Sequence, residues 1–254
     1  MLRIIRERLR QGHRTTPFPR GEPPALPARF RGLPVIDQSR CTDGCTACMD
    51  ACPTGALARG SDNLLRIDLG KCLFCGDCTA ACPTGAISFS SDYRLAARNR
   101  EDLVIGVNRL HLAEALGKDL RRLLGRSLKL RQVSAGGCNG CEADANVLTT
   151  VGWDMGRFGI QFVASPRHAD GLLVTGPVTM NMRLALEKTY AAVPRPKIVI
   201  ASGACAISGG PYVGAPEAHD GVAEILKVDL FLPGCPPHPL TLLDGLLRLL
   251  GRIR

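Results

Sequence analysis

The chain has 254 residues, a formal net charge of +9 and 12 cysteines, and it is 45% hydrophobic but only 4% aromatic. This length fits one large or two modest domains with an aliphatic core. The basic charge does not indicate nucleic-acid binding, because neither base-stacking aromatic residues nor a nucleic-acid fold signature accompanies it.

Residues 1–34 form a basic, proline-rich arm. Its first residues, MLRIIRERLRQGHR, lack the apolar run of a signal peptide, and no stretch of the sequence approaches the ~20 apolar residues of a membrane span. We therefore expect the chain to stay in the cytosol, where cysteines serve metal or redox chemistry more often than disulfides. Residues 1–40 carry nine arginines against three acids, a charge that suits acidic partners or anionic lipid.

A twelve-residue stretch occurs twice within residues 35–92. CTACMDACPTGA at 45–56 and CGDCTAACPTGA at 75–86 share eight of twelve positions, which marks an internal repeat. Close spacing lets three thiolates of one loop converge on one cluster, while the fourth cysteine, which proline follows, leads to the other cluster. The repeat therefore predicts an α+β ferredoxin-like domain with two 4Fe-4S clusters.

Each half of the repeat is expected to complete the cluster of the other half. The alternative is a zinc-binding structural protein, because C-x2-C is also zinc-knuckle spacing; the duplication and the PTGA tail favour iron. Three residues separate the first two cysteines where two are usual, and Gly44 is expected to absorb the extra one. The expected ligands are Cys41, Cys45, Cys48 and Cys82 for the first cluster, and Cys72, Cys75, Cys78 and Cys52 for the second.

Residues 93–130 are predicted to be a basic helical linker. The stretch LAEALGKDLRRLLGRSLKL places leucines at 112, 116, 120, 123 and 124, which predicts one apolar helix face beside arginines. Such a face packs on a neighbouring domain or lies on a membrane subunit or lipid surface. We favour packing on protein.

Residues 131–254 show the pattern of an α/β domain with a mainly parallel sheet. Short aliphatic runs predict strands at 127–134, 160–165, 171–176, 197–202 and 228–234, and helical patterns occupy 181–193 and 239–253. Strands that alternate with helices indicate parallel pairing, with helices on both faces.

Four further cysteines each follow one of these predicted strands. Because ligands collect at the carboxyl ends of parallel strands, we expect the four thiols to meet at one edge of the sheet. They form a third cluster or, alternatively, are small buried cysteines. These four are Cys138, Cys141, Cys205 and Cys235.

Two blocks of the sequence resemble a known family of redox complexes. GGCNGCEAD, SPRHADGLLVTGPVTMNM, PRPKIVIASGACAISGG and FLPGCPP, within 136–237, resemble the small subunit of group 4 membrane-bound NiFe hydrogenases. These include formate hydrogenlyase and are related to the 20 kDa subunit of complex I. RTTPFPRGEPPALPARFRGLPVIDQSRC, with the repeat that follows it, is similar to the two-cluster ferredoxin subunit of the same complexes. The chain thus resembles two usually separate subunits joined into one.

The resemblance implies that Cys138, Cys141, Cys205 and Cys235 hold a proximal 4Fe-4S cluster, for three clusters in all. The complex I subunit uses two adjacent cysteines, so the two-residue gap before Cys141 favours the hydrogenase branch. Glu142 matches an acid on the family's proton path, or is a carboxylate in the first turn of a helix. His168 and His238 are expected to be hydrogen-bonding or surface residues.

The implied function is electron transfer within an oxidoreductase complex, with no complete catalytic site in this chain. Electrons would pass between an external donor or acceptor and a hydrogenase large subunit-like, complex I 49 kDa-like protein. Membrane subunits and a donor such as formate dehydrogenase or a soluble ferredoxin are the other implied partners, at the cytoplasmic face of the inner membrane. The alternative is the same relay in a complex I-like quinone oxidoreductase or a hydrogenase-related complex without NiFe.

Overall fold

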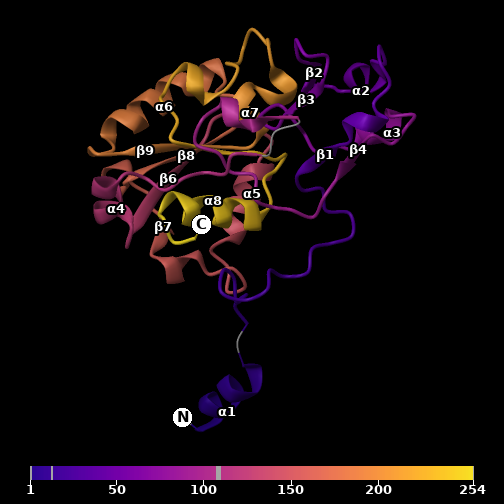
Figure 1. Ribbon diagram of the computed structural model, residues 1–254. Coiled ribbons are helices and arrows are strands. Elements are labelled where there is room, and N and C mark those ends of the chain that lie inside the picture. Colours follow the sequence, from indigo (N-terminus) through magenta and orange to yellow (C-terminus); the bar gives the residue numbers. More distant parts are fainter. Residues whose placement is uncertain (1, 13, 107–109, 254) are drawn as a thin grey trace.

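The computed structural model describes residues 2–12, 14–106 and 110–253. Three of the residues outside this description, 107–109, belong to the segment predicted as a basic linker. The chain begins with helix α1 (Leu2–Gln11), which projects away from the rest of the molecule (Figure 1). None of the residues of α1 is buried.

The cysteine repeat folds into two small antiparallel sheets and two short helices. Strand β1 (Pro34–Ile36) pairs with β4 (Ile87–Phe89), and β3 (Leu65–Asp68) pairs with both β2 (Leu57–Arg59) and β5 (Val104–Ile105). The helices are α2 (Ala47–Asp50) and α3 (Asp77–Ala81), one in each unit of the repeat, and a 3-10 turn covers Gln38–Arg40. Because β5 belongs to this region, part of the basic segment is built into the ferredoxin-type fold.

The rest of the basic segment lies against the second half of the molecule. Ala97 forms a bridge with Phe231, and the backbone N–H of Leu116 donates to the carbonyl of Leu249. Helix α4 spans only Lys118–Leu124 and begins after Gly117. It is therefore shorter than the helix that the leucine pattern predicted. Leu116 and Leu124 are buried whereas Leu123 is 60% exposed. The leucine face therefore packs mainly on protein.

The second half contains a five-stranded sheet whose neighbouring strands are all parallel, as predicted. The strand order is β10-β9-β8-β6-β7. The central strands, β8 and β9, are buried along their whole length, which explains their continuous aliphatic sequence. The bounds are β6 (Leu128–Ser134), β7 (Ile160–Phe162), β8 (Gly171–Thr175), β9 (Ile198–Ser202) and β10 (Leu230–Leu232).

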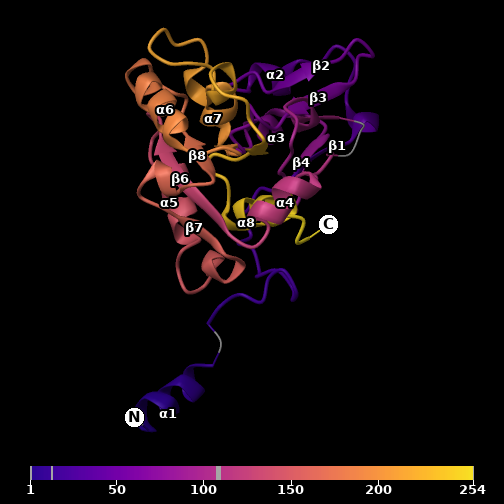
Figure 2. The ribbon, with the colours of Figure 1, turned by 90° about the vertical axis from the view of Figure 1, so that its left-hand side faces the viewer.

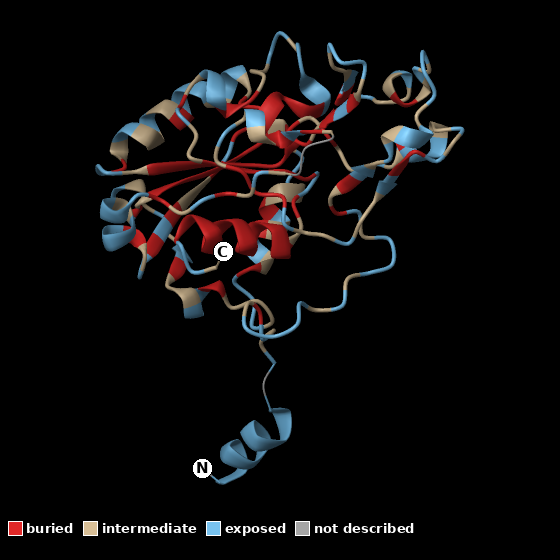
Figure 3. Cartoon of the chain, in the orientation of Figure 1, coloured by how far each residue is buried: buried red, intermediate tan, exposed pale blue. Residues whose placement is uncertain are grey.

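Helices cover both faces of this sheet (Figures 1 and 2). Helices α6 (Met180–Ala192) and α7 (Ala204–Ser208) lie on one face, and α5 (Gly140–Val147) and α8 (Pro239–Leu249) lie on the other. Alternate residues of β8 pack on opposite faces of the sheet, since Leu172 and Val174 belong to one core cluster and Leu173 belongs to the other. Every residue of α8 is buried, which makes it the most enclosed helix in Figure 3. Short 3-10 turns cover Glu101–Leu103, Met155–Phe158, Pro166–His168, Gly210–Tyr212 and Val222–Glu224.

The repeat region and the parallel sheet share one hydrophobic core. A single cluster of buried residues runs from Ile67 and Ile87 of the repeat to Val174 and Ile207 of the sheet domain. Ser208 in α7 donates a hydrogen bond of 2.8 Å to the carbonyl of Gly70 across this boundary. The two parts are therefore packed together, so that sites at their boundary have a fixed separation. Of the helices that the structure describes, none is both long and apolar enough to cross a bilayer.

Candidate iron-sulfur centres

The first group of cysteines surrounds one small cavity in the repeat region. Three of its members come from the first unit of the repeat and the fourth from the end of the second unit, as the crossed pattern predicts. Burial raises the pKa of the Cys48 thiol, and the neighbouring thiols of the group raise it further. The group consists of Cys41, Cys45, Cys48 and Cys82.

The second group surrounds a similar cavity next to the first. It consists of three cysteines of the second unit and the last cysteine of the first unit. Burial raises the pKa of Cys72 to about 12, although the Phe74 N–H donates to its sulfur at 3.3 Å and opposes this rise. Loading iron on these thiols therefore requires proton release. The group consists of Cys52, Cys72, Cys75 and Cys78.

The PTGA tail explains why the repeat extends beyond its cysteines. In both units the alanine N–H donates to the last cysteine sulfur at 3.2 Å, from Ala56 to Cys52 and from Ala86 to Cys82. The threonine hydroxyl of each tail lies 3.8 Å and 3.6 Å from the same sulfur, respectively. The glycine of each tail has a positive φ, +59° and +61°, which favours glycine because it lacks a Cβ. The tail thus forms a turn that directs hydrogen bonds at a thiolate.

The charged side chain of Arg59 contacts the first group, and the sequence did not predict this role. Its Nη2 donates to the Cys41 sulfur at 3.5 Å and to the carbonyls of Thr42 and Cys45 at 3.1 Å. Its buried Nε has no hydrogen-bond partner among the described residues. Nothing in the repeat signals this contact, because Arg59 stands outside both twelve-residue units on strand β2.

We expect Arg59→Met to lower the midpoint potential of one cluster by about 60 mV, because a lost charge-assisted hydrogen bond weakens the stabilisation of added negative charge. Redox titration followed by electron paramagnetic resonance measures this shift. Arg66→Met is the matched control, since Arg66 lies on the neighbouring strand, is 46% exposed and pairs with Asp62 at 2.8 Å. An equal shift in both variants would contradict a specific role of Arg59.

The third group lies at the carboxyl ends of strands β6, β9 and β10, as expected for an open parallel sheet. Burial raises the pKa of the Cys141 thiol, and the thiols of the other three members raise it further. Burial also raises the pKa of Cys205 to about 11. A Cβ on Gly203, whose φ is +91°, would lie 2.5 Å from the Cys141 sulfur, so this loop requires glycine. The group consists of Cys138, Cys141, Cys205 and Cys235.

Glu142 lies directly beside the third group in helix α5. Its side chain is buried and its Oε1 accepts a hydrogen bond of 2.6 Å from the Thr175 hydroxyl at the end of β8. Of the two histidines, His238 lines a pocket together with Cys235. His238 begins helix α8, where its Nδ1 accepts from the Leu240 N–H at 3.1 Å, and His168 is exposed. His238 therefore caps a helix, and burial lowers its pKa.

The second and third groups are neighbours across the boundary between the two parts of the chain. Partial desolvation of the Cys235 sulfur raises its pKa although the residue as a whole is exposed, and the thiols of Cys138 and Cys75 raise it further, so Cys75 of the second group lies near Cys235 of the third. One pocket is lined by both Phe74 and Cys235. Since Cys52 and Cys82 cross between the two units of the repeat, the second group adjoins both of the other groups.

The first two groups have the surroundings that an iron-sulfur cluster requires. Within the ranges that the structure describes, no three His, Cys, Asp or Glu side chains are placed to hold one metal ion. Instead, four thiols stand around each of the first two cavities, and both cavities receive N–H groups directed at sulfur. Four thiolates with surrounding N–H donors are the ligand set of a 4Fe-4S cluster. The grouping of the cysteines therefore has the pattern expected of an iron-sulfur protein.

Comparisons with known proteins identify the family. Residues 138–249 match the NADH ubiquinone oxidoreductase 20 kDa subunit family, and residues 40–87 match the 4Fe-4S dicluster domain. A probable membrane-bound hydrogenase subunit of Pyrococcus furiosus, mbhJ, is 42% identical over 134 residues, which are 53% of this chain and 80% of that protein. The chain therefore belongs to the family of the 20 kDa subunit of NADH ubiquinone oxidoreductase and the related hydrogenase small subunits, with a ferredoxin-type region added.

Two further relatives represent the two branches of this family. Formate hydrogenlyase subunit 7 of Escherichia coli is 42% identical over 132 residues, 52% of this chain and 52% of that protein. An NADH-quinone oxidoreductase subunit of Heliobacterium modesticaldum is 43% identical over 103 residues, 40% of this chain and 59% of that protein. The chain thus spans little more than half the length of these two relatives.

Proposed function

We propose that the chain relays electrons through three 4Fe-4S clusters, each held by one of the three cysteine groups. The observation that carries this proposal is that all 12 cysteines fall into three groups of four, and that the second and third groups adjoin. A bound cluster supplies one-electron transfer at a potential set by burial and hydrogen bonding. The ferredoxin-type region would exchange electrons with a donor or acceptor, and the third group with a catalytic partner.

The chain's own residues control how well each site performs this task. Burial of Cys48, Cys72 and Cys78 limits the access of water to the first two sites. N–H groups of Ala56, Ala86 and Phe74 stabilise thiolate charge. The shared core keeps the second and third groups at a fixed separation, which is what transfer between neighbouring clusters requires.

We further propose that the catalytic partner is a NiFe hydrogenase large subunit in a membrane-associated complex. Cys138 and Cys235 are exposed, which is consistent with a partner that covers the third group. The C-x2-C spacing of Cys138 and Cys141 supports the hydrogenase branch, and so do the hydrogenase and formate hydrogenlyase relatives. The buried Glu142 would lie beside this partner on its proton path.

We expect protein purified without oxygen to contain about twelve irons and about twelve acid-labile sulfides per chain. Cys205→Ala should lose about four of each, because the third cluster cannot form with three thiolates. Metal analysis and sulfide determination measure both values. About eight irons in the parent, unchanged by the substitution, would reduce the third group to structural cysteines, and zinc in place of iron would refute the relay.

A further inference from the structure

Helix α1 exposes an apolar face for which the described part of the chain provides no cover. Leu2, Ile4, Ile5 and Leu9 are 84%, 75%, 53% and 78% exposed. At 100° per residue, Leu2, Ile5 and Leu9 fall within an arc of about 60° and form one apolar stripe, whereas Ile4 lies about 100° from Ile5, outside the stripe. Isolated helices of this length are marginal in water, so this apolar stripe requires a surface to cover it.

The charges of α1 indicate what that surface is. Arginine is present at positions 3, 6, 8 and 10, against a single acid, Glu7. On the helical wheel Arg6 follows Leu2 on one side of the stripe, and Arg8 precedes Ile5 on the other. An apolar stripe with arginines on both sides is the pattern of helices that lie in the interface of an anionic bilayer, where the arginine stems reach up to the phosphates.

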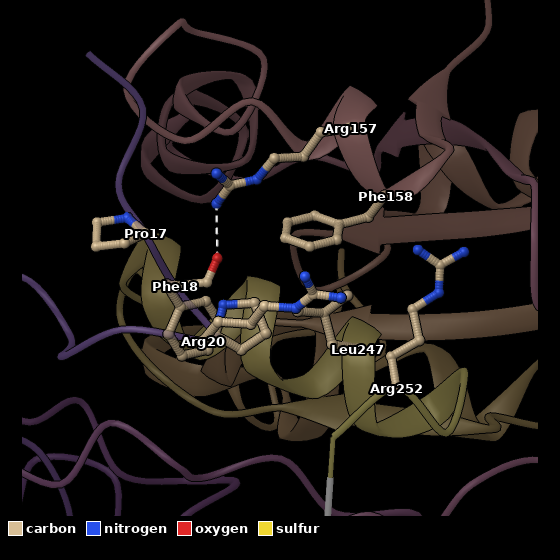
Figure 4. Close-up of a pocket in the computed structure, with 8 residues that line it drawn as sticks. Pro17, Phe18, Arg20, Arg157, Phe158, Leu247 and Arg252 are labelled. Atoms are coloured by element: carbon tan, nitrogen blue, oxygen red, sulfur yellow. Dashed lines mark hydrogen bonds between the residues drawn. The ribbon is translucent and has the colours of Figure 1, made fainter. Parts of the chain in front are cut away.

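A second basic feature lies where the arm from α1 joins the body of the molecule. A pocket of about 590 Å³ opens there, and Figure 4 shows arginines from three separate segments around it, with Phe18, Phe158 and Leu247 as its apolar lining. Of the described residues that line this pocket, none is acidic. These arginines are Arg20 of the arm, Arg157 of the 3-10 turn before β7, and Arg252 after α8.

The three arginines differ in how far the protein already uses them. Arg157 donates a 2.7 Å hydrogen bond to the Phe18 carbonyl, which fixes the arm to the body. Arg252 donates to the carbonyl of Gly125. Arg20 is exposed and extends its guanidinium over the pocket (Figure 4). A phosphate headgroup has the charge for this pocket, and the half-buried Phe158 offers an apolar surface to the start of its acyl chains.

We propose that α1 and this arginine pocket together form a docking surface for an anionic phospholipid bilayer. Helix α1 lies in the interface with its apolar stripe toward the acyl chains, and Arg20 contacts a headgroup phosphate. Only residues 12–16 separate α1 from Pro17 of the pocket along the sequence, which allows both elements to reach one membrane surface. This inference concerns lipid contact by the chain itself and does not depend on its clusters.

The test is co-flotation of the full-length, cluster-loaded chain with vesicles. We expect binding to phosphatidylcholine vesicles that contain about one third phosphatidylglycerol, and little binding to phosphatidylcholine alone. Ile5→Asp/Leu9→Asp should weaken binding about a hundredfold or more, because two apolar side chains lose their burial in lipid. Leu184→Asp is the matched control, since Leu184 is 59% exposed on helix α6. It should bind as the parent does.

The pocket is tested separately. Arg20→Ala should weaken binding to the anionic vesicles about fivefold. Arg167→Ala should not, because Arg167 is an exposed arginine that does not line the pocket. Iron per chain should stay unchanged in all four variants. Absence of vesicle binding by the parent, equal binding to neutral vesicles, or an unaffected Ile5→Asp/Leu9→Asp variant would overturn the proposal and assign α1 to a protein partner. An unaffected Arg20→Ala variant would remove the pocket from the docking surface.

Discussion

Replacement of Cys48 and Cys82 by alanine in one chain should cost about four irons, whereas replacement of Cys48 and Cys52 should cost about eight. The reason is the crossed arrangement of the repeat. Cys48 and Cys82 line the same cavity, although 34 positions separate them in the sequence. Cys52 is only four residues from Cys48 but lines the other cavity. Iron and sulfide determination on anaerobic protein distinguishes the two outcomes.

The single variants provide the reference for this experiment. Cys48→Ala, Cys52→Ala and Cys82→Ala should each lose about four irons, so only the pairs separate crossed from uncrossed ligation. The double variant Cys52→Ala/Cys75→Ala should also lose about four irons, since both cysteines line the second cavity. If the Cys48/Cys52 pair lost about four and the Cys48/Cys82 pair about eight, each unit of the repeat would hold its own cluster.

The sequence was sufficient for the parts of the fold that depend on local pattern. The duplicated cysteine stretch predicted the ferredoxin-type region, and the buried aliphatic runs predicted all five parallel strands to within a few residues. The meeting of the third group at one sheet edge could also be predicted, because parallel strands place their carboxyl ends together. Both predictions depend only on the spacing of residues along the chain and on the order of the strands, which the sequence contains.

Contacts between distant segments could not be predicted in this way. Strand β5 joins the repeat region, although its residues lie in the basic segment that the sequence indicated as a linker. Arg59 reaches the Cys41 sulfur from a strand outside the repeat. Side chains meet in these cases because tertiary packing brings their strands together, and no short-range pattern records such packing. The leucines near position 120 likewise gave a longer helix than the one that forms, because Gly117 precedes its first turn.

A buried ion pair in helix α8 should give the largest effect on stability. Arg248 donates to Asp244 at 2.7 Å, and the two side chains are only 7% and 2% exposed. We expect Arg248→Met to destabilise the fold by about 3 to 5 kcal/mol, because it leaves the Asp244 carboxylate buried without a counter-charge. For a chain of this size, 3 kcal/mol corresponds to a fall of about 6 to 12 °C in the midpoint of thermal unfolding, measured anaerobically by circular dichroism.

The pH dependence of this loss follows from Asp244. Burial raises the pKa of its carboxyl group even with Arg248 in place, and removal of the guanidinium raises that pKa further. A raised pKa means that the folded state holds the proton more tightly than the unfolded state, so stability falls as pH rises. The loss caused by Arg248→Met should therefore be smaller at pH 5 than at pH 8.

Two further variants separate charge burial from other effects of the substitution. Arg183→Met breaks a pair of the same spacing with Glu187, but both side chains are more than 40% exposed, so we expect about 0.5 kcal/mol or less. Arg248→Met/Asp244→Leu removes both buried charges and should recover most of the lost stability, because apolar residues replace a buried ion pair at little cost. If the double variant were no more stable than Arg248→Met, the aliphatic packing of the arginine stem, and not its charge, would account for the loss.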